Sequence, residues 1–170
     1  MDYNVTTLLQ EPLGAIRAYE LDDVIVDPLA TDTTAPVRGG IEILRTNRGV
    51  LVTGTLASEV TEECSRCLEP YVQQLAVEIE EEFLSSEDVP SVPEGDVLDD
   101  DYFKISPERI VDLTEAVRQA ILLARPMKPL CKEACAGLCQ QCGANLNKGR
   151  CNCPEESEDS HWAKLKELLK

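Results

Sequence analysis

The sequence has few aromatic residues, so its core must be built mainly from Val, Ile and Leu, and it has almost no histidine to act as a general base. Aromatic residues make up 4% of the chain, and His161 is the one histidine among 170 residues. His161 adjoins Trp162 in a short stretch with helical periodicity, so we interpret it as a surface residue. The sequence also has no nucleophile elbow, P-loop or dinucleotide-binding fingerprint. We therefore expect a protein that acts by binding and is not an enzyme.

Long hydrophobic runs are missing as well. No stretch approaches the roughly 20 apolar residues that a helix needs to cross a bilayer, and the first residues lack the positive charge and apolar segment of a secretory signal. We therefore expect a cytoplasmic protein without a membrane partner. In a reducing compartment its 8 cysteines would be metal ligands or redox thiols and not disulfides.

Positive charge is scarce over most of the chain. The formal net charge is −16, and residues 1–102 hold 5 Lys or Arg against 23 Asp or Glu, whereas residues 103–153 hold 8 against 4. Nucleic acid would be repelled by the first part, because affinity for phosphate comes from Lys and Arg. Basic proteins would be attracted to it, although the acid excess also has a simpler interpretation, which is solubility alone.

The hydrophobic pattern predicts an α+β fold with a mainly antiparallel sheet or partly closed barrel in the first 84 residues. Strands are expected at residues 3–9, 21–26 and 71–83, and a hairpin at residues 40–57 with its turn at residues 46–49. Ser106 and Pro107 indicate the start of one long helix at residues 107–124, and Pro126 and Pro129 prevent its continuation. A second, short helix is expected at residues 160–169.

Composition divides the chain into two parts. Residues 1–130 form the α+β body, which includes a mobile acidic loop at residues 85–101 that is rich in acid, Pro and Ser. Residues 131–170 form a cysteine-rich metal knuckle and the terminal helix. The second part has few apolar residues of its own, so we expect a metal ion to contribute directly to its folding.

Six cysteines fall within 23 residues and predict a Zn²⁺ site: Cys131, Cys135, Cys139, Cys142, Cys151 and Cys153. Cys139 and Cys142 are separated by two residues and precede Gly143, which lets the backbone turn its N–H groups toward the sulfurs. One ion needs four ligands. The other two are either the pair Cys151 and Cys153 or the pair Cys131 and Cys135, or one residue from each flank.

A separate pair, Cys64 and Cys67, lies between two predicted strands. Three interpretations remain open: a structural turn, half of a metal site, or a redox dithiol in which Arg66 lowers a thiol pKa. The redox interpretation lacks the βαβ pattern of a thioredoxin-like fold. It would require one of the two thiols to be exposed.

Three segments resemble the YceD family, the large ribosomal RNA subunit accumulation proteins. They are residues 64–70 (CSRCLEP), Asp112 and Leu113 with the helix that ends at residues 125–131 (RPMKPLC), and residues 137–147 (GLCQQCGANLN) with the cysteines and terminal tryptophan that follow. The resemblance implies a cytoplasmic bacterial or plastid protein that supports accumulation of 23S ribosomal RNA in ribosome biogenesis, without known catalysis. Some family members lack the cysteine-rich end, so we expect the metal to stabilise the protein.

The charge map and the resemblance together predict how such a protein would bind. Its acidic body would engage a basic ribosomal protein or the pre-ribosomal large subunit, with no small-molecule substrate. Ribosomal RNA phosphate would contact a basic set in the last third of the chain: Arg118, Arg125, Lys128, Lys132, Lys148 and Arg150. The alternatives are a thiol redox protein that uses Cys64 and Cys67, and a partner of a basic ribosomal protein that makes no RNA contact.

Overall fold

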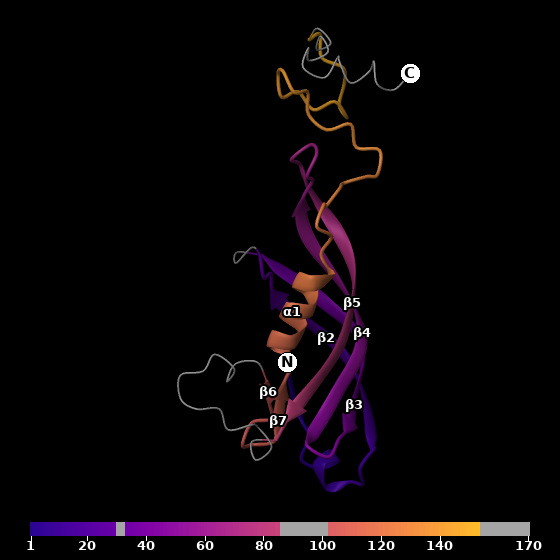
Figure 1. The fold of residues 1–170 in the computed structure, drawn as a ribbon, viewed down its shortest axis with the longest axis vertical. Helices are drawn as coiled ribbons and strands as arrows, with labels where there is room; N and C mark the ends of the chain where they lie inside the picture. The colour runs from indigo at the N-terminus through magenta and orange to yellow at the C-terminus, as the bar shows by residue number, and fades with distance from the viewer. Residues whose placement is uncertain (30–32, 86–101, 154–170) are drawn as a thin grey trace, which may run out of the picture.

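The computed structural model describes residues 1–29, 33–85 and 102–153. A five-stranded sheet dominates it, in the order β2 (Ile16–Val26), β3 (Thr34–Arg45), β4 (Gly49–Glu63), β5 (Pro70–Leu84) and β6 (Phe103–Lys104). Neighbouring strands are antiparallel except β6, which runs parallel to β5. Strands β1 (Asp2–Asn4) and β7 (Ile110–Asp112) form a second, two-stranded sheet, and α1 (Thr114–Ala124) packs against β5 (Figure 1).

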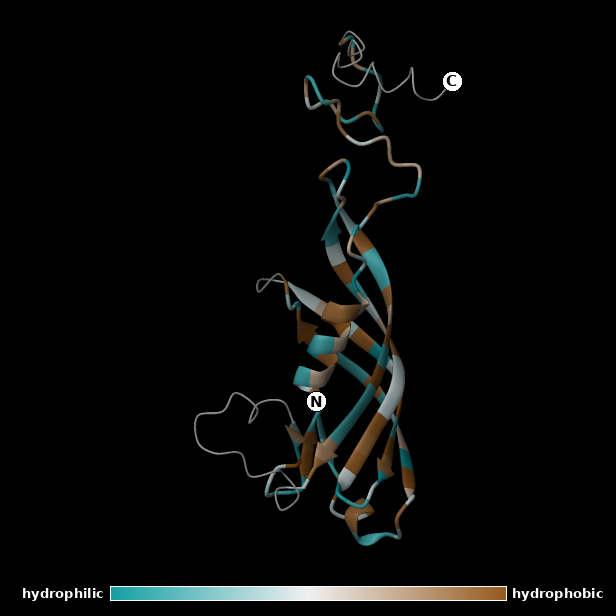
Figure 2. Cartoon of the chain, in the orientation of Figure 1, coloured by the Kyte–Doolittle hydropathy of each residue, from teal (hydrophilic) through white to brown (hydrophobic). Residues whose placement is uncertain are grey.

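Alternation of side chains along the strands gives the large sheet one buried face. In β4 the buried residues include Val52, Leu56 and Val60, whereas Ala57 and Glu59 are exposed. Figure 2 shows the same alternation of brown and teal along the strands. Because successive residues of a strand point to opposite faces, the buried set meets α1, and the core consists mainly of Val, Ile and Leu.

The hairpin predicted at residues 40–57 is confirmed and is longer than expected, since β3 pairs with β4 from Val37 opposite Ser58 to Arg45 opposite Val50. In its turn, the Gly49 N–H donates to the Thr46 hydroxyl (3.0 Å). Gly49 is needed there for a reason other than positive φ, because a Cβ atom at this position would lie 2.0 Å from the carbonyl oxygen of Phe83.

The sheet is open and does not close into a barrel. Among the described residues, β2 and β6 lie at its two edges and do not pair with each other. The strand expected at residues 3–9 is mostly absent: β1 ends at Asn4 and a 3-10 turn follows (Leu8–Gln10). Val5 and Leu8 are nevertheless buried in the core, which explains the apolar pattern that suggested a strand.

The helix predicted at residues 107–124 begins later, at Thr114. Residues 106–109 instead form a tight turn, in which the Arg109 N–H donates to the Ser106 carbonyl (2.9 Å) and Arg109 has a φ of 59°. Ser followed by Pro suits the first two positions of a turn as well as a helix start. Pairing of β7 with β1 then removes residues 110–112 from the helix, and the predicted end at Ala124 is correct.

A buried charge cluster fixes the chain where it leaves α1. The Arg125 guanidinium contacts Asp27 at 2.5 Å and Glu62 at 2.9 Å, and the arginine side chain is 7% exposed. Beyond this point the chain follows the end of the β4–β5 hairpin (Figure 1). The acidic loop from residue 86 onward and the predicted terminal helix, with His161 and Trp162, lie outside the described residues.

Candidate metal centre

The eight cysteines gather into two groups of four, in each of which all sulfurs lie within 4.8 Å of one another. The first tetrad consists of Cys64, Cys67, Cys131 and Cys135, and the second tetrad consists of Cys139, Cys142, Cys151 and Cys153. All eight are free thiols. The first tetrad joins two parts of the chain that are far apart in sequence, whereas the second is built from one continuous segment.

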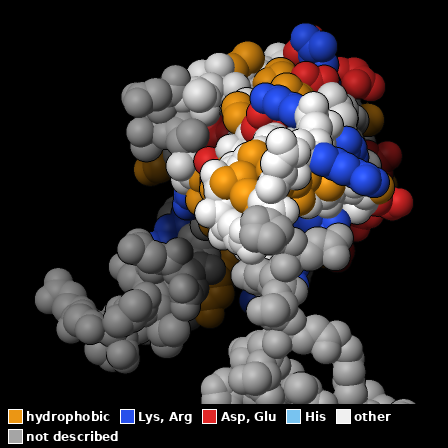
Figure 3. Space-filling view, turned by 90° about the horizontal axis from the view of Figure 1, so that it is seen from above, with side chains coloured by type: hydrophobic (Ala, Val, Ile, Leu, Met, Phe, Trp, Pro, Cys, Tyr) orange, Lys and Arg blue, Asp and Glu red, His pale blue; other side chains and the backbone are white. Residues whose placement is uncertain are grey.

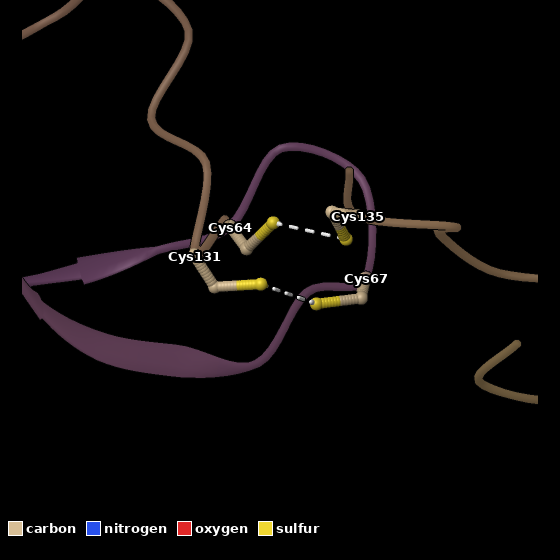
Figure 4. A group of neighbouring side chains, drawn as sticks. All are labelled: Cys64, Cys67, Cys131 and Cys135. Atoms are coloured by element: carbon tan, nitrogen blue, oxygen red, sulfur yellow. Dashed lines mark hydrogen bonds between the residues drawn. The ribbon is translucent and has the colours of Figure 1, made fainter. Parts of the chain in front are cut away.

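In the first tetrad, the loop between β4 and β5 supplies two sulfurs and the segment after α1 supplies the other two (Figure 4). The Cys64 and Cys135 sulfurs are 3.8 Å apart, and those of Cys67 and Cys131 are 3.7 Å apart. A disulfide would need about 2.05 Å. Four sulfurs around a tetrahedral zinc, each at about 2.3 Å from the ion, lie about 3.8 Å from one another. The spacing therefore fits a shared ion.

Three of the four cysteines of the first tetrad are shielded from solvent, and the fourth, Cys131, is exposed. Cys64, Cys67 and Cys135 are at most 4% exposed and form a small cluster with three partly buried side chains, Tyr71, Leu130 and Leu138. Hydrogen bonds hold the two segments together: the Ser65 N–H donates to the Pro129 carbonyl (2.8 Å), and the Arg66 guanidinium donates to the Cys135 carbonyl (2.9 Å). Such a site can stabilise structure but leaves little room for a substrate.

The second tetrad is more open. Cys142 is exposed, and Cys139, Cys151 and Cys153 are half-buried. Gly143, which follows Cys142, has a φ of 71°, the left-handed conformation that glycine adopts without strain. The backbone therefore turns at Gly143, after Cys139 and Cys142, where the sequence led us to expect a turn.

The Cys-x-x-Cys loops of the two tetrads have the same backbone hydrogen bonds. Cys64 N–H donates to the carbonyl of Glu69 (3.0 Å), and Cys139 N–H donates to that of Ala144 (2.9 Å). The residue after the second cysteine donates back to the first cysteine's carbonyl, at 2.9 Å in both loops. In the first loop this residue is Leu68, which has a φ of 57°. The two loops are thus one local structure used twice.

Within each tetrad, the surroundings lower the pKa of one thiol and raise the pKa of another. A hydrogen bond from the Cys131 backbone lowers the pKa of Cys64 to about 6, and loss of hydration together with the neighbouring sulfurs raises the pKa of Cys131 to about 12. In the second tetrad, N–H groups of residues 142 and 141 lower the pKa of Cys139 to about 6, whereas a hydrogen bond with Cys142 raises the pKa of Cys153 to about 12. Adjacent thiolates repel one another, and a divalent cation among them would remove that repulsion.

The donor sets fit zinc. Four thiolates in a tetrahedral arrangement are typical of structural Zn²⁺ sites, and soft sulfur ligands disfavour Mg²⁺ and Ca²⁺. With four protein ligands, no coordination position would remain open for water or substrate. An ion in either tetrad would therefore act structurally, by joining four positions of the chain.

One side chain links the tetrads. Asn147 lies in the loop between Cys142 and Cys151, yet its amide nitrogen donates to the sulfur of Cys135 in the first tetrad (3.3 Å). Its side-chain oxygen accepts a hydrogen bond from the backbone N–H of Ala136 (3.0 Å). Hydrogen bonds of this kind orient metal ligands and tune their basicity.

The structure groups the cysteines in one of the ways that the sequence left open. Cys139 and Cys142 come together with Cys151 and Cys153, one of the pairings considered, whereas Cys131 and Cys135 come together with Cys64 and Cys67. The two thiols considered for redox chemistry thus share a tetrad and are buried. The count of cysteines was a usable signal, because two four-ligand sites need eight. The first tetrad also takes ligands from both sides of the predicted boundary at residue 130.

The six predicted RNA-contact residues differ in how freely they can reach a partner. The Arg125 guanidinium is not available to a phosphate, because it is buried in ion pairs with two acids whose side chains are 2% and 11% exposed. Arg118 pairs with Glu115, and Lys148 pairs with Glu69 beside the first tetrad. The rest of the set is exposed, namely Lys128, Lys132 and Arg150. Figure 3 shows Lys and Arg side chains among hydrophobic ones in the end-on view.

Comparison with known proteins agrees with the sequence motifs. The model of the family "Large ribosomal RNA subunit accumulation protein YceD" matches residues 52–169, a stretch that contains all eight cysteines. The chain belongs to the YceD family. An uncharacterized protein of Mycobacterium tuberculosis is 31% identical over 176 residues, which span 99% of this chain and 81% of that protein. One from Mycobacterium leprae is 26% identical, over 98% of this chain and 76% of that protein.

A plant relative carries the family's name. The chloroplastic large ribosomal RNA subunit accumulation protein YCED homolog 1 of Arabidopsis thaliana is 26% identical over 155 residues, 78% of this chain and 48% of the plant protein. No solved structure matches this chain. No helix in the described part of this YceD protein is long and apolar enough to cross a membrane.

Proposed function

We propose that this protein is a ribosome biogenesis factor that supports accumulation of large-subunit ribosomal RNA by binding, without catalysis. Membership of the YceD family carries this proposal, together with the name of the plant relative. In the proposal, a zinc ion held by Cys139, Cys142, Cys151 and Cys153 shapes the end of the chain that docks on the pre-ribosomal large subunit.

Each tetrad offers a full set of four sulfur ligands, which supports a binding role over an enzymatic one. A catalytic zinc keeps one coordination position for water or substrate, whereas structural sites use four protein ligands, and each tetrad supplies four sulfurs. The thiol redox alternative needs an accessible cysteine. Cys64 and Cys67 are 0% and 4% exposed, so we favour binding.

Acidic side chains on the open face of the sheet support a basic protein partner. Strands β2 to β5 place Glu20, Gly40, Thr55 and Glu78 side by side in one row across the sheet. In the next row on the same face, Thr53 of β4 lies between Glu42 of β3 and Glu80 of β5. An excess of acid on a surface speeds association with an oppositely charged protein, and Arg38 on this face is paired with Asp22. A basic ribosomal protein is such a partner.

Exposed cations near the tetrads support a separate contact with RNA. Lys128 and Lys132 flank the start of the cysteine-rich segment, and Arg150 precedes Cys151. Each is exposed and, in the proposal, would neutralise a phosphate. Arg125 is left out of this set because it is buried with its two acidic partners.

The test is co-purification of pre-ribosomal particles from cells, with and without nuclease. Replacing Lys128, Lys132 and Arg150 by Gln should weaken association and flatten its salt dependence, because log affinity falls with log salt by roughly 0.7 to 0.9 per phosphate contact. The matched control removes three exposed positive charges that lie outside the two acidic rows of the sheet: Arg17→Gln, Arg48→Gln and Arg109→Gln.

The outcomes separate the candidate functions. RNA contact is supported if the control variant still associates with the particles and the variant at Lys128, Lys132 and Arg150 does not. Association that survives both nuclease and the variant contradicts RNA contact and indicates a partner of basic protein alone. Absence of any association with large-subunit particles contradicts the proposed function as a whole.

A further inference from the structure

We propose that this protein binds two zinc ions, and that the ion in the first tetrad fastens the end of the β4–β5 hairpin to the segment that carries the second tetrad. The inference concerns metal content and chain organisation. It shares the ion of the second tetrad with the proposed function and adds the ion of the first tetrad, and it does not depend on which partner the protein binds.

Sulfur geometry is the first support. Cys64 to Cys135 and Cys67 to Cys131 span 3.8 and 3.7 Å between sulfurs, close to the edge of about 3.8 Å of a tetrahedron with zinc–sulfur bonds of about 2.3 Å. These pairs lie 71 and 64 residues apart in sequence. Ordinary packing of small side chains has no reason to bring four thiols from two segments to this spacing.

The repeated loop is an independent support. The first tetrad's Cys64 loop has the same pair of backbone hydrogen bonds as the Cys139 loop, whose sequence is typical of a metal knuckle. To achieve this, Leu68 adopts a left-handed φ of 57°, a conformation that is sterically unfavourable for a residue with a Cβ atom. Strain of this kind persists where surrounding interactions impose it, and a metal ion held by Cys64 and Cys67 would impose it.

The fold gives the first ion a clear structural task. Between Pro129 and Cys153 the described chain contains no helix, and its one sheet-like contact is the bridge between Leu138 and Asn145. The apolar cluster around the first tetrad is small, with Tyr71, Leu130 and Leu138 as its partly buried members. A segment with so little apolar burial needs another source of stability, and metal binding is such a source.

Position makes this ion a fastener between the two parts of the molecule. Its ligands Cys64 and Cys67 follow β4, while Cys135 is followed within four residues by Cys139 of the second tetrad. Gly137 between them packs closely on the first loop, since a Cβ atom there would lie 3.1 Å from the Arg66 carbonyl oxygen. The first ion would therefore set where the second knuckle lies relative to the sheet.

The test is the zinc content of the purified full-length chain, measured by elemental analysis and native mass spectrometry, with X-ray absorption to identify the ligands. We expect two zinc ions per chain and four sulfur neighbours at about 2.3 Å for each. One zinc per chain, or a mean coordination with nitrogen or oxygen in place of sulfur, overturns the proposal. This measurement uses the unaltered protein, so misfolding of a variant cannot obscure it.

Paired variants then assign the ions. Cys67→Ala with Cys131→Ala should reduce the content to one zinc, and Cys142→Ala with Cys153→Ala is the matched change in the second tetrad, with the same expected count. Retention of two ions by the first double variant contradicts the assignment. In limited proteolysis, the first variant should be cut at residues 129–138 and the second should not, and the reverse pattern contradicts the fastening role.

Discussion

At the scale of single residues, Asn147 joins the segment between the cysteines of the second tetrad to the Cys135 sulfur of the first tetrad. We expect Asn147→Leu to weaken zinc retention by the first tetrad by about 10–100-fold, because loss of an outer hydrogen bond to a ligand typically has that effect, here the bond to the Cys135 sulfur. Competition with a colorimetric chelator measures it. Gln141→Leu changes an amide in the second tetrad's Cys-x-x-Cys loop, where the side chain is exposed, and is the control. Equal zinc affinities of the two variants would contradict the coupling.

Leu68 provides a second test at this scale, because its side chain is 55% exposed and its φ is 57°. We expect Leu68→Asn to leave the free energy of unfolding unchanged or slightly increased, since Asn tolerates the left-handed region. Leu68→Val should lower it by about 1 kcal/mol or more, because β-branched residues are outliers there. Denaturant unfolding of the zinc-loaded protein measures both, and equal stabilities of the two variants would show that the loop carries no such strain.

At the scale of residues, the sequence predicted proximity of cysteines where the local pattern was complete. Cys139, Cys142 and Gly143 are close together in sequence, and their spacing alone indicates a knuckle. The Cys64 loop gave a weaker signal because Leu68 occupies the position where Gly143 stands in the other loop. Its partners, Cys131 and Cys135, become neighbours only through the fold.

At the scale of elements, the end of α1 is joined to the sheet by Arg125 and its two carboxylates. We expect Arg125→Ala to lower the free energy of unfolding by about 3–5 kcal/mol, because its removal leaves the two buried carboxylates of Asp27 and Glu62 without a cation. The exposed pair of Arg38 and Asp22, with the Asp22 side chain 73% exposed, is the control. Asp22→Ala should change stability by less than about 1 kcal/mol, and similar losses in both variants would contradict the structural role assigned to Arg125.

Helices and strands were predictable from sequence where one regular spacing of apolar residues extended over the whole element. Residues 41–45 alternate and are followed by turn residues, and the hairpin exists. The helix start was wrong because Ser106 and Pro107 suit a turn equally well, and long-range pairing of β7 with β1 decided between the two. Likewise, an apolar pattern at the N-terminus could not distinguish a strand from a short strand followed by a 3-10 turn, because burial of Val5 and Leu8 is common to both.

At the scale of the whole molecule, sequence suggested two parts joined at residue 130, with metal in the second part. In the structure, the first tetrad combines Cys64 and Cys67 from the β4–β5 hairpin with two cysteines of that second part. Composition cannot reveal a ligand set that is shared between distant segments. The consequence is that metal removal should affect one end of the sheet as well as the cysteine-rich segment.

Hydrogen exchange with and without a zinc chelator tests the central claim most directly, since it reports opening segment by segment. We predict that chelation removes protection from residues 64–69 and 129–153, because both depend on the ions for their fixed arrangement. Protection of the paired core of β3 and β4, residues 37–58, should remain, because that core is held by buried Val, Ile and Leu. Unchanged exchange at residues 64–69 and 129–153, or loss of protection throughout the sheet, would contradict the account.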